Sequence, residues 1–285
     1  MIASFLLDSI RFICLFCIVV GMSGGRVRRR WDTNLDYWVR LVREGRDDYR
    51  EFMNKPYYLD MVGDISGLDL LDLACGEGYF SRIFAESGAN VTSIDFSEGM
   101  IGAAVDEEER VPLGIRYITA DATDMHMLED DSFDVVCSFM ALMDIRDYEG
   151  AVREVSRVLR DDGRFVCIFL HPCFSWKRIH DGVTMSDWVR ILREDGLKDY
   201  PYLKVVDYFT RHNYEMTWRN EETGKDIATI QFHRTLSDYF NTMGKVGLFI
   251  RRMEEPKPVN EDLPHNMTKL FRIPHSILIE AVNMR

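Results

Sequence analysis

The chain has 285 residues, of which 46% are hydrophobic and 29% charged, a balance typical of one globular protein with a large core. Its formal net charge of −12 argues against a broad nucleic-acid interface, which needs clustered Lys and Arg. The six cysteines show neither disulfide nor zinc spacing, so we expect no metal site and a reducing, cytoplasmic location.

Residues 1–22 form an apolar leader of doubtful role. Its apolar stretch, Phe12 to Met22, is too short to span a bilayer comfortably, and Asp8 and Arg11 interrupt any longer version. The basic run RVRRR follows this stretch, whereas a secretory signal carries its positive charge first. We expect the leader to add nothing to the fold and no stable membrane insertion. A weak surface anchor and a buried accessory helix remain alternatives.

Apolar spacing divides the next part of the chain into helices and strands. Helical spacing predicts an N-terminal helical cap over residues 23–66. From residue 67 to residue 171, short apolar runs alternate with helical patterns, which predicts βαβ units and a parallel sheet covered on both faces. The predicted strands are 68–73, 91–94, 115–119, 133–139 and 164–170, and the predicted helices are 79–86, one starting at Ser97, and 148–159.

The βα rhythm stops after His171. Residues 172–225 hold Trp176, Trp188 and Trp218 without a clean βα unit, so we expect an insertion that forms a substrate lid. The same tryptophans are compatible with a core position. Residues 226–256 then predict a C-terminal strand, helix and strand of the same domain, and residues 257–285 an irregular tail. The predicted fold class is α/β, with a doubly wound, mostly parallel sheet.

The stretch DLACGEGYF, Asp72 to Phe80, lies where the first predicted strand meets the first predicted helix. Ligands of open parallel sheets bind beyond the carboxyl ends of the strands, and glycines let the backbone pass close to them. The third glycine of a dinucleotide fingerprint is Ser81 here, and Asp72 and Glu77 would repel a pyrophosphate. A cationic ligand with an ammonium and a sulfonium is therefore favoured over NAD.

Two further acids close the next two predicted strands. Asp95 is placed to accept both hydroxyls of a ribose, and Asp121 to accept from an exocyclic amine of adenine. Either residue alone could be a helix cap or turn former. Three acids at successive strand ends, Asp72 included, favour a ligand site over three independent caps.

The segments DLACGEGYFSRIFAESGANVTSIDFSEGMI, ITADATDM and DSFDVVCSFMALMDI together resemble the class I S-adenosylmethionine-dependent methyltransferases that modify small molecules. The resemblance covers residues 67–170 and, less closely, residues 232–256. It implies a Rossmann-like, seven-stranded sheet whose last strand is antiparallel, expected in the arm at 247–254. The fourth predicted strand ends in SFMALMD where amino-modifying members carry an Asn/Asp-Pro-Pro-Tyr run, so base or amide methylation is not implied.

The resemblance also implies roles for individual residues. The cofactor-binding residues it implies are Asp72, Ala74, Cys75, Gly76 and Gly78 for the methionine part, Asp95, Phe96 and Met100 for the ribose and adenine, Asp121 and Ala122 for the adenine edge, and Phe139 and Met140 near the sulfonium. His171 and His233, which end predicted strands, are candidate catalytic residues, and Asp144 is a weaker one. Tyr37 and Tyr49 of the helical cap could contact the cofactor.

The expected function is S-adenosylmethionine-dependent methyl transfer to a small-molecule acceptor. Two alternatives stay open: a binding protein on the same fold without turnover, and an NAD-dependent oxidoreductase. The sequence names neither the acceptor nor the oligomeric state.

Overall fold

The structure is a computed structural model that describes residues 25–174, 177–178, 184–192, 194, 198–220, 223–224, 226–259 and 269–285. The predictions for the leader and for Trp176 lie outside the described residues, as does that for the Trp218 side chain. No helix in the described part of the chain is long and apolar enough to cross a membrane.

Helices open the described chain, as the apolar spacing predicts. Residues 25–43 are helical. A π-helical turn, η1 (Arg50–Asn54), leads directly into α2 (Lys55–Val62). Pro56 lies in the first turn of α2, directly after the π-helical turn.

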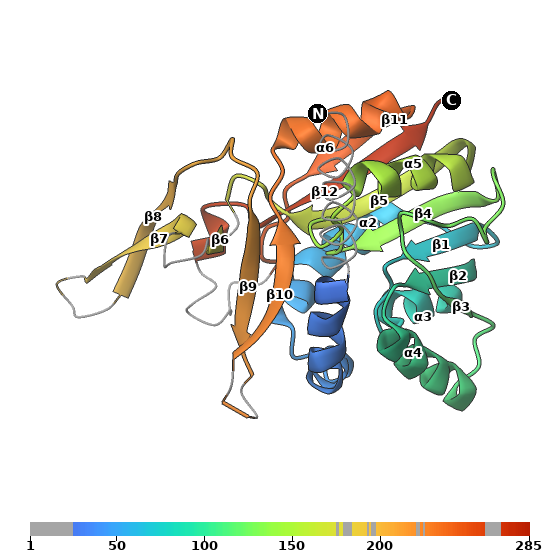
Figure 1. Cartoon of the computed structure of the whole chain (residues 1–285), viewed down its shortest axis with the longest axis horizontal. Helices are drawn as coiled ribbons and strands as arrows, with labels where there is room; N and C mark the ends of the chain where they lie inside the picture. The colour runs from blue at the N-terminus through green and yellow to red at the C-terminus, as the bar shows by residue number, and fades with distance from the viewer. Residues whose placement is uncertain are drawn as a thin grey trace, which may run out of the picture.

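A seven-stranded sheet is the centre of the fold (Figure 1), with the strand order β11-β12-β5-β4-β1-β2-β3. Its strands are β1 (Asp69–Leu73), β2 (Asn90–Asp95), β3 (Arg116–Thr119), β4 (Phe133–Phe139), β5 (Leu159–Leu170), β11 (Leu248–Glu254) and β12 (Ser276–Asn283). The first five are parallel, and β12 pairs antiparallel with both β5 and β11. The predicted mostly parallel, doubly wound sheet with an antiparallel last strand is confirmed.

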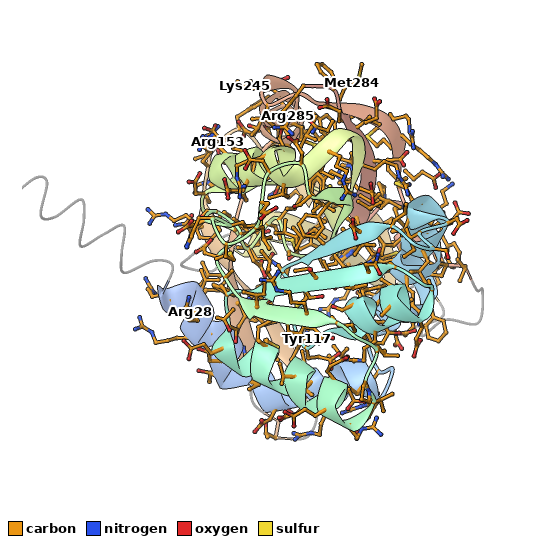
Figure 2. All side chains as sticks on the ribbon, turned by 90° about the vertical axis from the view of Figure 1, so that its right-hand side faces the viewer. Arg28, Tyr117, Arg153, Lys245, Met284 and Arg285 are labelled. Atoms are coloured by element: carbon orange, nitrogen blue, oxygen red, sulfur yellow. The ribbon has the colours of Figure 1, made fainter. Side chains whose placement is uncertain are left out.

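The C-terminal part of that prediction is wrong in its residues. The segment 248–254 is the edge strand β11 and runs parallel to β5, because both pair antiparallel with β12. The antiparallel strand is β12, from the stretch expected to be an irregular tail. The strand β10 (Asp226–Phe232) does not join the main sheet but pairs with β9 (Asn213–Arg219). Lys245, Met284 and Arg285 gather at one end of the molecule, away from Arg28 and Tyr117 (Figure 2).

Both faces of the sheet are covered by helices. On one face, α2 and α3 (Tyr79–Glu86) bury an aromatic group that includes Tyr58, Phe80 and Phe84. On the other, α5 (Tyr148–Val158) and α6 (Leu236–Lys245) pack with Phe165 and Phe169. The helix α4 (Glu98–Arg110) packs beside β2 and β3. Successive residues of the central strands point into opposite clusters, which explains their nearly continuous apolar runs.

The segment expected to be an insertion, residues 172–225, forms two small sheets beside the main one together with β10 (Figure 1). One contains β6 (Lys177–Arg178), β7 (Thr184–Leu192) and β8 (Lys198–Val205), and the other is the β9–β10 hairpin. The hairpin lies against the N-terminal helix: Asn34 Nδ2 donates to the Ala228 carbonyl at 3.2 Å, and Arg30 pairs with Glu215 at 2.8 Å. These contacts bring helix 25–43 and the hairpin to the same edge of the molecule.

Candidate functional site

A cavity of about 990 Å³ lies at the carboxyl ends of β1, β2, β3 and β4. Helix 25–43, η1 and the β9–β10 hairpin also contribute to its wall. Eleven of the twelve predicted cofactor-binding residues line it: Asp72, Ala74, Cys75, Gly76, Asp95, Phe96, Met100, Asp121, Ala122, Phe139 and Met140. The topology thus brings residues from four strand ends to one cavity, as expected for an open α/β sheet.

The loop after β1 has a backbone shaped for close approach. Ala74 and Gly76 both have positive φ, at 59° and 57°. A methyl group built on Gly76 would meet no atom within 4 Å, so this glycine borders open space. Met140 at the end of β4 has a φ of 54° and also lines the cavity. Positive φ at an alanine and a methionine is strained and tends to occur at functional sites.

Asp72 is a buried acid near the carboxyl end of β1 that lines the cavity. It is 2% exposed, and its Oδ2 accepts a hydrogen bond from Ser81 Oγ at 2.6 Å. Burial raises the pKa of Asp72 to about 7, which the Ser81 hydrogen bond opposes and the nearby Asp95 reinforces. A buried acid whose ionised form is so poorly stabilised favours a cationic ligand.

Asp95 is tied to two loops at once. Its Oδ2 accepts from the Gly76 amide at 3.0 Å and its Oδ1 from the Ser97 amide at 2.9 Å. Burial raises the pKa of Asp95 to about 6, although both amide hydrogen bonds oppose the rise. Asp121 is exposed, and its Oδ1 accepts from the backbone and hydroxyl of Thr123.

Comparison with known proteins identifies the segment that carries this site. Residues 71–167 match the family described as "Methyltransferase domain". A crystal structure of an S-adenosylmethionine dependent methyltransferase from Mesorhizobium loti superimposes with a TM-score of 0.61 at 26% identity, over 80% of this chain and 96% of that one. A structure from Listeria monocytogenes assigned to the same class gives 0.65 at 28% identity, over 81% and 96%.

Residues 71–167 thus carry a methyltransferase domain, and the fold around them is similar to that of S-adenosylmethionine-dependent methyltransferases. Among curated relatives, a demethylmenaquinone methyltransferase of Clavibacter sepedonicus is 38% identical over 39% of this chain. A ubiquinone biosynthesis O-methyltransferase of Coxiella burnetii is 25% identical over 64% of this chain and 75% of its own length. The chain spans less than half of the length of the Clavibacter protein, 45%.

The residues of the cavity fit S-adenosylmethionine. The open loop at Gly76 and the two buried acids suit its ammonium, its ribose and its positive charge. Phe96, Met100 and Phe139 supply apolar surface for its adenine and thioether carbons. Arg28 lies over the Phe96 ring, 5.7 Å from the ring centroid, so helix 25–43 borders this part of the cavity.

Glu77 and Gly78 differ in their surroundings from what the sequence predicts. Glu77 is 2% exposed, and its carboxylate is bound by Arg43 at 2.8 Å and Arg82 at 2.9 Å. Its charge is therefore compensated, so the expectation of a cationic ligand rests on Asp72 and Asp95. Gly78 lies outside the cavity lining: it precedes α3 with a φ of 80°, and a methyl group there would lie 2.4 Å from Tyr117 Oη.

The two predicted catalytic histidines do not reach the cavity. His171 is 3% exposed, with Nε2 3.1 Å from Glu255 and Nδ1 accepting from the Cys173 amide. His233 is also 3% exposed, and its Nε2 donates to the Tyr208 carbonyl at 2.7 Å. Both rings are held by neighbouring structure at strand ends, and neither is among the cavity-lining residues. Their placement gives no support to a catalytic role.

The other lining residues include an apolar group, here called the far half of the cavity. This group comes from helix 25–43, the segment after β4, the end of β5 and β9, and it comprises Val27, Trp31, Trp38, Ala141, Met143, Ile145, Leu170 and Met216. Trp31 and Trp38 pack edge to face with ring centroids 5.3 Å apart. Among the tryptophans that the structure describes, the two that line the cavity come from the helical cap, whereas Trp188 is buried outside it, beneath Lys269.

Two polar residues of the cavity, Gln231 and His275, were not predicted from the sequence. Asp144, noted as a weaker candidate, lines the cavity with Gln231 and His275. Tyr37 and Tyr49 line it as predicted, and the Tyr49 ring lies 4.8 Å from that of His275. The pKa of His275 is lowered to about 4, mainly by burial and also by the positive charges of the neighbouring Lys269 and His171. The signal for His275 was its position just before β12, which the sequence did not reveal as a strand.

Proposed function

We propose that this protein is an S-adenosylmethionine-dependent methyltransferase that transfers a methyl group to a small-molecule acceptor. The observation that supports it is one cavity that is lined both by eleven of the predicted cofactor residues and by a group of apolar and aromatic side chains. A cofactor and an acceptor bound in the same cavity can be held with their reacting atoms in contact, which supplies much of the catalysis for an already activated methyl group.

The roles of the cofactor residues follow from their placement. Asp72 and the loop at Ala74–Gly76 would hold the methionine part, and Asp95 the ribose hydroxyls. Phe96 and Met100 would pack on the adenine. When bound, S-adenosylmethionine supplies a methyl group on a positively charged sulfur. The chain itself positions this group and excludes water with the apolar residues around Phe139 and Met140.

A small acceptor fits the far half better than a macromolecule. The wall there is built from helix 25–43 and the β9–β10 hairpin, which enclose the space on the side away from the sheet. The net charge of −12 gives no basis for binding nucleic acid. The names of the curated relatives refer to quinone precursors, which are apolar ring compounds, and the aromatic lining is compatible with such molecules.

The competing function is a binding protein that holds the cofactor without turnover. Both functions require that S-adenosylhomocysteine raise the melting temperature and that NAD leave it unchanged, since a ligand stabilises the state to which it binds. Stabilisation by NAD alone would contradict the cofactor assignment. Incubation with methyl-labelled S-adenosylmethionine and metabolite extracts separates the two: labelled small-molecule product supports the methyltransferase, and cofactor binding without any product supports the binding protein.

A further inference from the structure

Asp144 is the acid of the apolar half of the cavity. It follows β4 by five residues and lines the cavity beside Met143 and Ile145. Its Oδ1 is buried and accepts no hydrogen bond from the described residues. Gln231 on β10 also lines the cavity, is 2% exposed, and its Oε1 is likewise without a donor among the described residues. Two buried acceptor atoms without donors are costly, which points to a ligand that carries the missing hydrogen.

We infer that Asp144 and Gln231 form the acceptor-binding end of the site, that the methyl acceptor is an aromatic or otherwise apolar molecule with a weakly acidic hydroxyl, and that Asp144 Oδ1 takes the proton of that hydroxyl. This inference rests on the proposed function. It adds the class of acceptor and the residue that activates it. The two open acceptor atoms favour a hydroxyl donor, and the Trp31 and Met143 surfaces favour an apolar body.

The surroundings of Asp144 suit a proton acceptor. The ionisable groups that interact with Asp144 include Tyr214 on β9 and Tyr239 on α6, and Arg234 after β10 lies beside both tyrosines. Arg146 and Asp147 of the same segment also line the cavity. Burial raises the pKa values of both tyrosines, so they stay neutral at physiological pH. Arg234 donates to the carbonyls of residues 145 and 146 at 2.6 and 2.7 Å, which holds the segment that carries Asp144.

The pKa of Asp144 itself is compatible with this role. Burial raises it to about 8, and hydrogen bonds from Gln231 and Trp31 oppose part of the rise. A base whose pKa lies near the working pH is matched to a phenol-like hydroxyl, with a pKa of about 10, and poorly matched to an alkyl alcohol.

In the proposed step, the acceptor oxygen loses a proton and gains the methyl group. The acceptor O–H bond breaks, and its proton goes to the ionised Oδ1 of Asp144, which becomes a carboxylic acid. The oxygen uses the electron pair that it keeps to bond the methyl carbon. The carbon–sulfur bond breaks with its electrons on sulfur, so the positive charge of the sulfonium is lost and neutral S-adenosylhomocysteine remains.

Binding of two matched probes tests this inference without turnover. The protein is saturated with S-adenosylhomocysteine and titrated with 2-naphthol or with 2-methoxynaphthalene, which lacks only the hydroxyl hydrogen. We expect 2-naphthol to bind about ten- to a hundredfold more tightly, as a hydrogen bond to a charged group allows. This preference should grow as the pH rises through the ionisation of Asp144, while the naphthol, with a pKa of about 10, stays neutral.

Two variants assign the preference to Asp144. Asp144→Leu should abolish it, and Asp144→Asn should weaken it and remove its pH dependence; Asp106→Leu on α4, an exposed position, is the matched control and should leave it unchanged. Unchanged affinity for S-adenosylhomocysteine shows that a variant is folded. If Asp144→Leu does not fold, Asp144→Asn alone decides whether Asp144 causes the preference. Equal affinity for the two probes in the wild type, binding of neither, or a preference that survives at Asp144→Asn with its pH dependence intact overturns the inference. Failure of the wild type to bind S-adenosylhomocysteine would instead contradict the proposed function.

Discussion

The Asp95 carboxylate accepts a hydrogen bond from the Gly76 amide at 3.0 Å, and this contact joins the ends of β1 and β2. The second oxygen of Asp95 accepts from the Ser97 amide, while the Ser97 hydroxyl caps α4 by accepting from Met100 N at 3.1 Å. Ser97 therefore caps the helix, and Asp95 lines the cavity. Asp95 shapes the loop and faces the cavity, and Ser97 begins the helix.

Asp95→Ala should therefore reduce both binding and stability. We expect affinity for S-adenosylhomocysteine to fall about ten- to a hundredfold, because charge-assisted hydrogen bonds are lost. The unfolding free energy should fall by about 1–3 kcal/mol, since the Gly76 and Ser97 amides lose their acceptor. Calorimetric titration and urea denaturation measure the two effects. The control, Ser97→Ala, should cost about 1 kcal/mol of stability and leave affinity nearly unchanged. Normal binding by the folded Asp95 variant would remove this residue from the site.

The two glycines of the same loop should respond differently to alanine. At Gly78 the new methyl group would lie 2.4 Å from Tyr117 Oη, and the φ of 80° disfavours any side chain. We expect Gly78→Ala to cost about 2–4 kcal/mol through crowding and strain. At Gly76 the methyl group meets no protein atom but enters the cavity.

Gly76→Ala should consequently cost only about 1–2 kcal/mol, through its positive φ. Its main effect should be weaker binding of S-adenosylhomocysteine. Melting temperature and affinity, measured on both variants, give the comparison. A larger loss of affinity at Gly78 than at Gly76 would show that the cofactor approaches the loop differently.

The cofactor half could be predicted from the sequence because its signals are local. The first three strands of residues 67–171 are apolar runs with an acid at or just beyond the end, and the fourth ends at Phe139 and Met140. The rule that ligands bind at the carboxyl ends of parallel strands then places those residues together. Eleven of the twelve cofactor residues follow that rule. Gly78 does not, because its signal, a glycine at a strand-to-helix turn, is equally that of close packing with a side chain such as Tyr117.

The acceptor half could not be predicted because it is assembled from distant segments. Trp31 comes from helix 25–43, Gln231 from β10, and His275 from the start of β12. Nothing in the local pattern shows that β10 leaves the main sheet, or that a strand follows the segment after β11. Both facts depend on pairing with distant strands. His171 and His233 have the expected strand-end positions, but pairing and packing turn their rings to Glu255 and the Tyr208 carbonyl.

Replacement of Glu77 tests which acid selects the cofactor. In Glu77→Gln, Arg43 and Arg82 lose a charged partner but are partly exposed and can be hydrated, so we expect a loss of about 1–3 kcal/mol. Stabilisation by S-adenosylhomocysteine, and the absence of stabilisation by NAD, should both persist. Thermal melts with each ligand measure this. New binding of NAD by the variant would show that the Glu77 charge, although paired, contributes to selectivity.

The buried acids predict how stability and binding depend on pH. The pKa of Asp72 is about 7 and that of Asp95 about 6 in the folded protein, both above the ordinary aspartate value of 3.8. Between the ordinary value of 3.8 and about pH 7, the folded state therefore holds more protons than the unfolded state. Since stability falls with pH wherever the folded state binds more protons, these two acids should together lower the unfolding free energy of the ligand-free protein by roughly 6 kcal/mol from about pH 4 to pH 7.

Affinity for S-adenosylmethionine should change in the opposite direction. A cationic ligand is bound best by ionised carboxylates, so its affinity should rise with pH, by up to about tenfold per pH unit for each acid that must ionise. S-adenosylhomocysteine lacks the sulfonium charge and should show a weaker rise. Urea denaturation and calorimetric titration across this range measure the two trends, and Asp95→Asn should reduce both slopes. Constant stability together with pH-independent affinity would mean that neither acid changes its ionisation on folding or on binding, and would contradict the assignment of Asp72 and Asp95 to the cationic ligand.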